Sequence, residues 1–208
     1  TVTIVDPHRP GHELNYYPGE VCLRMADVAV INKIDSASKE GIDTVKANIK
    51  KVNPKAQIIM ADSKITVDNP DIIKGKRVLV VEDGPTLTHG EMKIGAGTVA
   101  AERIGAAEMV DPRPYTVGKL KDTFSIYPNI GKLLPAMGYG EQQLKDLEET
   151  INKTDCDAVI IGTPIDLTRV ININKPCTRV HYELDEVSSP NLCDIIGKFI
   201  KDHNLDRK

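Results

Sequence analysis

Apolar residues along this chain form short unbroken runs, a pattern typical of parallel strands buried on both faces of a sheet. These runs predict strands at residues 2–5, 28–31, 57–60, 77–81, 158–161 and 179–182. Between them, apolar positions recur at helical spacing, which predicts helices at residues 38–51, 97–105, 141–152 and 191–202. Ser38 is a residue type that caps helix N-termini. Because strands and helices alternate, we expect right-handed crossovers between parallel strands.

A break in this pattern suggests where one unit ends. Residues 62–76 are polar and contain Asn69-Pro70, so we predict a linker there. The predicted fold class is α/β, with two Rossmann-like three-layer units of mostly parallel sheet. The first unit, residues 1–75, is expected to be an incomplete nucleotide-binding domain of the P-loop NTPase type. The second, residues 76–208, is expected to be a C-terminal Rossmann-like domain.

Composition narrows the classes of function. The 208 residues are 40% hydrophobic and 27% charged, with a formal net charge of -3, so we expect neither a nucleic-acid binder nor a membrane-surface binder. No apolar run approaches the roughly 18 residues that cross a bilayer, and no signal peptide is visible. The cysteines form no CxxC pair, which predicts free buried thiols in a reducing cytoplasm. They are Cys22, Cys156, Cys177 and Cys193.

The strongest chemical signal is Asn32-Lys33-Ile34-Asp35, directly after the predicted strand at residues 28–31. NKxD is the guanine-specificity motif of GTPases. The Asp35 carboxylate would accept hydrogen bonds from the N1–H and amino groups of guanine, a donor pair that adenine lacks. Asn32 would tie neighbouring loops together, and the stem of Lys33 would lie over the base. The alternative is an ordinary solvated loop between a strand and a helix.

A second signal, DPHRPG at residues 6–11, follows the first predicted strand. An Asp at the end of an apolar strand, with a Gly five positions later, fits the loop that holds Mg²⁺ and senses the γ-phosphate of a nucleotide. Asp6 would organise the metal, and the Gly11 amide would face the terminal phosphate. His8 and Arg9 would add charge beside it. The alternative is a structural turn in which Asp6 acts as a cap.

The remaining parts of a nucleotide site are weak or absent. Ala61, Asp62 and Ser63 follow a predicted strand, where GTPases carry a loop that backs the base through main-chain amides, but this match is loose. No GxxxxGK[ST] phosphate-binding loop occurs in the sequence. Because the chain also opens inside an apolar run without an initiator Met, we expect a missing N-terminal domain that carries this loop. The chain is expected to be inactive without it.

The second predicted unit has candidate chemistry of its own. Residues 95–100 read GAGTVA at the start of a predicted helix, so the amides near Gly95 and Gly97 would approach an anion. Close packing of the helix on the sheet is an equally good interpretation. His89 lies in the long polar loop before this helix. Arg113 and Arg169 follow later strands and would clamp a phosphate or carboxylate, or form ordinary surface ion pairs.

Longer stretches of the sequence are distinctive. They are DPHRPGHELNYYPGEV, RMADVAVINKID, VEDGPTLTHGEMKIGAG, VDPRPY, YPNIGKLLPAMGYG and GTPIDLTRVI. With these stretches the chain resembles, over nearly its whole length, the family of cyclic 2,3-diphosphoglycerate synthetases and related predicted GTPases. The resemblance implies that an NTP activates one phosphate of 2,3-bisphosphoglycerate and that the neighbouring phosphate closes an intramolecular phosphoanhydride. It also implies a small anionic phosphorylated substrate and Mg²⁺.

Several functions stay open at this stage. The resemblance is associated with ATP, whereas NKxD favours GTP, so GTP or ATP is expected as the nucleotide. A nucleotide-dependent synthetase is the first interpretation, and a GTP-binding regulatory or chaperone-type GTPase is the second. A catalytically silent binding module is the third. Cationic side chains in the loops of the second unit favour the enzyme. A homo-oligomer is compatible with each interpretation.

Overall fold

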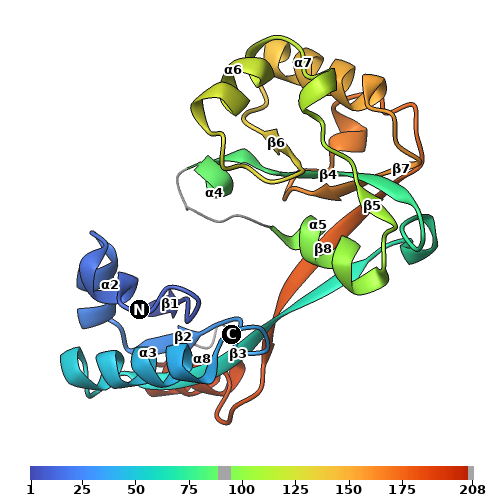
Figure 1. Ribbon diagram of the computed structural model, residues 1–208. Coiled ribbons are helices and arrows are strands. Elements are labelled where there is room, and N and C mark those ends of the chain that lie inside the picture. Colours follow the sequence, from blue (N-terminus) through green and yellow to red (C-terminus); the bar gives the residue numbers. More distant parts are fainter. Residues whose placement is uncertain (89–94, 206–208) are drawn as a thin grey trace. The chain divides into compact units, whose positions relative to one another are not determined.

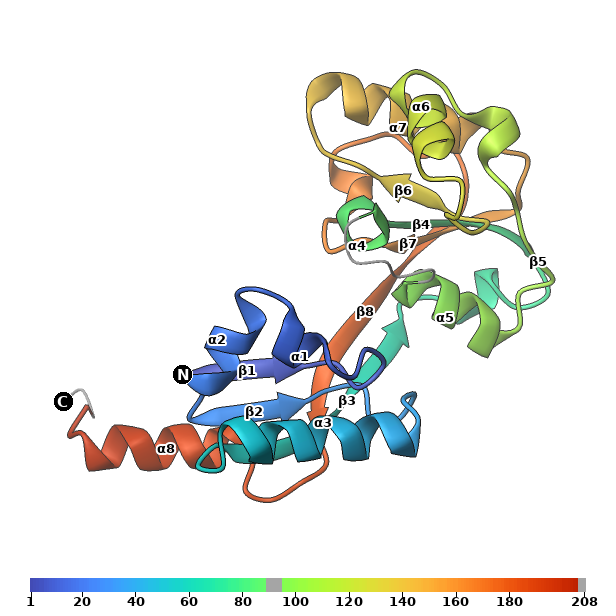
Figure 2. The ribbon, with the colours of Figure 1, turned by 60° about the vertical axis from the view of Figure 1, so that its left-hand side comes forward.

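The computed structural model describes residues 1–88 and 95–205 (Figures 1 and 2). It is an α/β fold in which most strand pairs are parallel. The contacts divide the chain into unit 1, Thr1–Lys64 with Glu183–Lys208, and unit 2, Ile65–Tyr182. Strands β3 (Gln57–Val67) and β8 (Cys177–Glu186) each have residues in both units.

Unit 1 is built on a parallel sheet in the order β1-β2-β3. Besides β3 and the end of β8, its elements are β1 (Val2–Val5), α1 (His12–Asn15), α2 (Gly19–Arg24), β2 (Val28–Ile31), α3 (Lys39–Val52) and α8 (Leu192–Asp202). Helix α3 begins where predicted, because the Ser38 hydroxyl accepts a hydrogen bond from the Gly41 amide at 3.1 Å.

The core of unit 1 has helices on both faces of its sheet. Ala29 and Ile31 pack with Val45 of α3 on one face. Val28 and Val30, the alternate residues of β2, point to the other face, where they pack with Leu192 and Ile195 of α8. Because side chains alternate along a strand, β2 is buried at all its positions. This explains its unbroken apolar run.

In unit 2 the strands of the sheet follow the order β8-β7-β4-β5, with β6 also paired to β4. Its other elements are η1 (Pro70–Ile72), β4 (Arg77–Asp83), α4 (Gly84–Thr88), α5 (Ala96–Ile104), β5 (Glu108–Met109), η2 (Arg113–Tyr115), α6 (Lys119–Ile126), β6 (Leu134–Ala136), α7 (Glu141–Lys153), β7 (Ala158–Gly162) and η3 (Leu167–Arg169).

The winding of unit 2 marks a position at its sheet edge. Helix α5 lies on one face of the sheet, and α6 and α7 lie on the other (Figures 1 and 2). The chain first passes from β4 to β5 on one side and later adds β7 on the other side of β4. In open α/β sheets, ligands bind outside the carboxyl ends of the strands where the winding reverses. In unit 2 this place lies beyond β4 and β7.

The structure corrects the predicted linker. Residues 62–67 belong to β3, and only η1 and the turns around it separate β3 from β4. The strand continues because Ile65 and Val67 alternate with Lys64 and Thr66, the pattern of a half-buried strand. The division into units also differs from the predicted boundary near residue 75. Residues 65–75 group with unit 2, and α8 groups with unit 1 because it packs on β2 and β3.

Two predictions from composition can be compared with the structure. The four cysteines are free, as predicted, but the prediction that they are buried is wrong for Cys22 and Cys193, which are exposed. Within residues 1–88 and 95–205, no helix has the length and apolar character needed to span a bilayer.

Candidate functional site

The first candidate site lies at the carboxyl edge of the unit 1 sheet. Asp6, Asn32 and Ala61 each follow residues that pair in register across β1, β2 and β3. The Asn32 amide donates to the Val5 carbonyl at 3.1 Å, and the Ile34 amide donates to the Ala61 carbonyl at 3.2 Å. The loop that carries NKID is therefore bound to both neighbouring strands. The exposed side chain of Asp35 lies in this loop.

Asp6 is the centre of a network of hydrogen bonds and charges. Its Oδ2 accepts from Lys33 Nζ at 3.0 Å and from Arg9 Nη2 at 3.1 Å, and its Oδ1 accepts from the His8 amide at 3.0 Å. Burial favours the neutral acid, but the Lys33 hydrogen bond, the His8 amide and the two cations outweigh it, so the pKa of Asp6 is lowered. Lys33 therefore points at Asp6, from a backbone with φ of 62°.

This geometry bears on the predicted Mg²⁺ site. Mg²⁺ in nucleotide enzymes usually takes one or two carboxylates together with phosphates and waters. Both oxygens of Asp6 are already engaged, and Lys33 and Arg9 balance its charge. Among the residues that the structure describes, no group of three or more His, Cys, Asp or Glu side chains is placed to hold a metal ion. These residues do not fit a magnesium site by themselves.

The loop after Asp6 also differs from the prediction. The Gly11 amide, expected to face a phosphate, donates to Glu13 Oε2 at 2.9 Å. Glu13 is 7% exposed, and its other oxygen accepts from Asn48 Nδ2 at 2.6 Å. The Glu13 carboxylate therefore accepts the hydrogen bond that the Gly11 amide was expected to give to a phosphate. His8 Nε2 lies 3.0 Å from the Ser36 hydroxyl, so His8 joins this loop to the one that carries NKID.

Ala61, Asp62 and Ser63 lie within strand β3, so the prediction that they form a loop is wrong. Ala61 is fully buried. Asp62 Oδ1 is buried and has no hydrogen-bond partner within the described part of the chain. Because buried polar atoms are nearly always satisfied, a ligand or a water molecule is the expected partner of Asp62.

The second candidate site lies at the carboxyl edge of the unit 2 sheet, where the winding reverses. Glu82 at the end of β4 is 2% exposed. Its Oε1 accepts from the Thr98 amide at 2.8 Å and from the Thr98 hydroxyl at 3.1 Å, at the first turn of α5. Burial raises the pKa of Glu82 to about 7, although hydrogen bonds from Thr98, Gly97 and Gly95 oppose the rise.

Glycines surround this carboxylate because nothing larger fits. A Cβ atom on Gly162 would lie 2.5 Å from Glu82 Oε2 and 2.9 Å from the Gly97 nitrogen. A Cβ atom on Gly97 would lie 2.9 Å from Val80 Cγ1. Gly95 and Gly97 were predicted to bind a cofactor, but their amides surround an internal carboxylate. These contacts match the close packing of helix on sheet that was the alternative interpretation.

Sequence reasoning assigned no role to Glu82 or to Tyr139. Tyr139 Oη is buried without a hydrogen-bond partner in the part of the chain that the structure describes. Burial and the Asp83 carboxylate raise the pKa of Tyr139, and the nearby Thr163 hydroxyl opposes the rise. Thr163 itself donates to the Ile165 carbonyl at 2.7 Å. An acidic residue at the end of an apolar strand was the available signal for Glu82.

The other predicted residues of unit 2 are not brought together. Arg169 is 83% exposed and lies 3.4 Å from Asp166, a surface ion pair as in the alternative interpretation. Arg113 pairs with Asp111 at the carboxyl end of β5. His89 lies outside the described residues.

Comparison with known proteins shows what this chain is similar to. No family model matches the sequence. The chain is 58% identical over 200 residues to arginine synthetase ArcE of Thermococcus kodakarensis, a match that covers 96% of this chain. It covers 45% of the relative, so the chain spans about half the length of the protein that it matches.

Proposed function

We propose that this chain is part of a nucleotide-dependent synthetase. The observation that carries the proposal is the 58% identity, across nearly the whole chain, with a protein named arginine synthetase. A synthetase couples cleavage of a nucleotide to the formation of a bond. Arginine is therefore the first candidate product, and cyclic 2,3-diphosphoglycerate, from the sequence resemblance, is the second.

The site in unit 1 supports a role in binding the nucleotide. NKID lies at the carboxyl edge of a parallel sheet, where such ligands bind, and Asp35 is exposed there. Its carboxylate would select guanine over adenine, which makes GTP the first nucleotide to test and ATP the second. Asp6, Lys33 and Arg9 would position charge beside the phosphates when their network rearranges.

The phosphate-binding loop is proposed to come from a part of the protein outside these 208 residues. The sequence contains no GxxxxGK[ST], and the relative is more than twice as long as the matched region. With that part absent, we expect the chain to be inactive. A GTP-binding regulatory protein is the competing function, and NKID alone favours it.

Product analysis of the full-length protein tests the proposal. The guanidinium group of arginine has a nitrogen where the corresponding ureido amino acid has its ureido carbonyl oxygen. This ureido amino acid together with ammonium is therefore one substrate set. The other is 2,3-bisphosphoglycerate. Each is incubated with GTP or ATP, and the nucleotide and products are separated by chromatography. Turnover coupled to either product supports a synthetase. A rate of nucleotide hydrolysis that neither substrate set changes supports the regulatory GTPase instead.

A further inference from the structure

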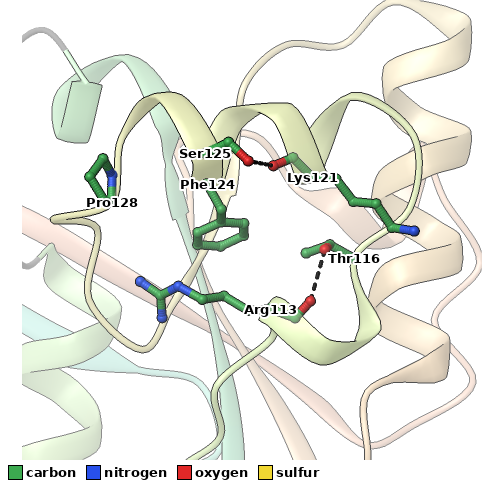
Figure 3. A pocket seen from close by; sticks show the side chains of 6 residues that line it. All are labelled: Arg113, Thr116, Lys121, Phe124, Ser125 and Pro128. Atoms are coloured by element: carbon green, nitrogen blue, oxygen red, sulfur yellow. Dashed lines mark hydrogen bonds between the residues drawn. The ribbon is translucent and has the colours of Figure 1, made fainter.

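A pocket in unit 2 is lined by none of the side chains described around Asp6 or Glu82. It has a volume of about 390 Å³ and lies between η2 and α6, open to solvent. Its walls come from one stretch of chain: Arg113, Thr116, Lys121, Phe124, Ser125 and Pro128 (Figure 3). Volumes of about 300–1,000 Å³ are usual for pockets that bind small molecules.

Arg113 is fixed in place at one side of the pocket. Its Nη1 donates to both oxygens of Asp111, at 3.0 and 2.9 Å, and its Nη2 donates to the Ile130 carbonyl. The guanidinium lies 4.9 Å from the centre of the Phe124 ring. The Arg113 Nε–H takes no part in the hydrogen bonds found among the described residues. This donor lies in the plane of a guanidinium that packs beside the Phe124 ring.

Lys121 supplies a second cation on the exposed face of α6. Within the described residues, its ammonium group has no hydrogen bond or ion pair. The hydroxyls of Thr116 and Ser125 donate to main-chain carbonyls, at 2.9 and 3.1 Å (Figure 3), so they add no donors for an anion. The pocket therefore has the Lys121 ammonium group on one side of the Phe124 ring and, on the other side, the Arg113 guanidinium, whose charge Asp111 balances (Figure 3).

We propose that this pocket binds a small organic acid through its carboxylate. The Lys121 ammonium is the charged partner of the carboxylate, and Phe124 and Pro128 contact the carbon skeleton. The substrate class rests on the proposed function, since arginine and 2,3-bisphosphoglycerate both carry a carboxylate. The binding itself requires neither nucleotide nor turnover.

Calorimetric titrations of the protein without nucleotide test the proposal. The probes are L-arginine, 2,3-bisphosphoglycerate and inorganic phosphate, which has no carbon skeleton. Lys121→Ala removes an exposed charge, and Lys74→Ala is the matched control, an exposed lysine of unit 2 outside the pocket. We expect one organic acid to bind the wild type, Lys121→Ala to weaken it about tenfold or more, and Lys74→Ala to leave it unchanged.

Three results would overturn the proposal. They are no binding of either organic acid, equal loss of affinity in the two lysine variants, and phosphate binding as tight as that of the acids. Pro128→Ala separates packing from charge, because Pro128 is an exposed, uncharged residue of the pocket lining. It should weaken binding of the organic acid and leave any phosphate binding unchanged. Because the titrations contain no nucleotide, a failure of the pocket to bind leaves the proposed function intact, and the product analysis tests that function separately.

Discussion

The buried carboxyl group of Glu82 makes the stability of unit 2 depend on pH. Its pKa rises from an ordinary value of 4.5 to about 7 because burial disfavours the charge. A group with a raised pKa in the folded state binds a proton on folding. Its contribution to stability is fully present below pH 4.5 and is lost as the pH rises through 7. Each pH unit is worth about 1.4 kcal/mol, so the loss is about 3 kcal/mol.

Glu82→Gln is the perturbation that isolates this effect. Glutamine keeps the shape of the neutral acid, and its carbonyl oxygen still accepts from Thr98. It does not titrate. The difference in unfolding free energy between wild type and variant should therefore change by about 3 kcal/mol from pH 4.5 to 8. Other titrating groups, such as Asp6, are shared by both proteins and largely cancel in the difference.

The assay has to report on unit 2 alone, because a chain with two units does not guarantee a single unfolding transition. Urea titrations followed through the NMR signals of buried amides in β4 and β7 meet this need. Relative to the variant, the wild type should lose stability as the pH rises. Parallel curves would refute the raised pKa. A wild type that gains stability with pH would show that the amides of α5 outweigh burial.

Three other substitutions test separate parts of the structure. Ser38→Ala removes the N-cap of α3 and should lower the unfolding free energy of unit 1 by about 1 kcal/mol; no change in a urea titration would deny the capping role. Gly162→Ala places a methyl group against Glu82 and should cost roughly 1–3 kcal/mol, whereas the control Gly197→Ala, with open space around it, should be neutral or slightly stabilising. In the full-length protein, Asp35→Asn should shift binding from GTP towards xanthosine triphosphate, and unchanged discrimination in a titration would exclude Asp35 from recognising the base.

The central strands were predictable because they are buried on both faces. The apolar runs of β2, β4 and β7 need no knowledge of their neighbours to be recognised. The helices α3 and α7 were predictable from periodicity, and the prediction of each is confirmed. Short elements such as β5 and α1 were missed because they contain too few residues to show a period.

The return of the chain to unit 1 was not predictable from local pattern. Helix α8 was recognised, but the sequence does not say which sheet it covers. Leu192 and Ile195 could pack on any apolar face, and only the assembled fold places them against β2 and β3. The same limit applies to β8, whose residues lie in both units. Such long-range pairing depends on tertiary contacts rather than on propensity.

The loop at Gly11 and the loop before α5 show why a glycine motif predicts a backbone that can approach an acceptor closely, but does not predict which acceptor binds there. In unit 1 the Gly11 amide meets Glu13, and in unit 2 the amides at the start of α5 meet Glu82. Glycine lets the backbone approach an acceptor closely, and in both loops that acceptor is a carboxyl group of the chain itself. A glutamate near such a loop competes with any phosphate for the same donors. A phosphate would bind at either place only if it displaced that carboxyl group. The buried glutamates, rather than the glycines, therefore decide whether these amides can accept a phosphate.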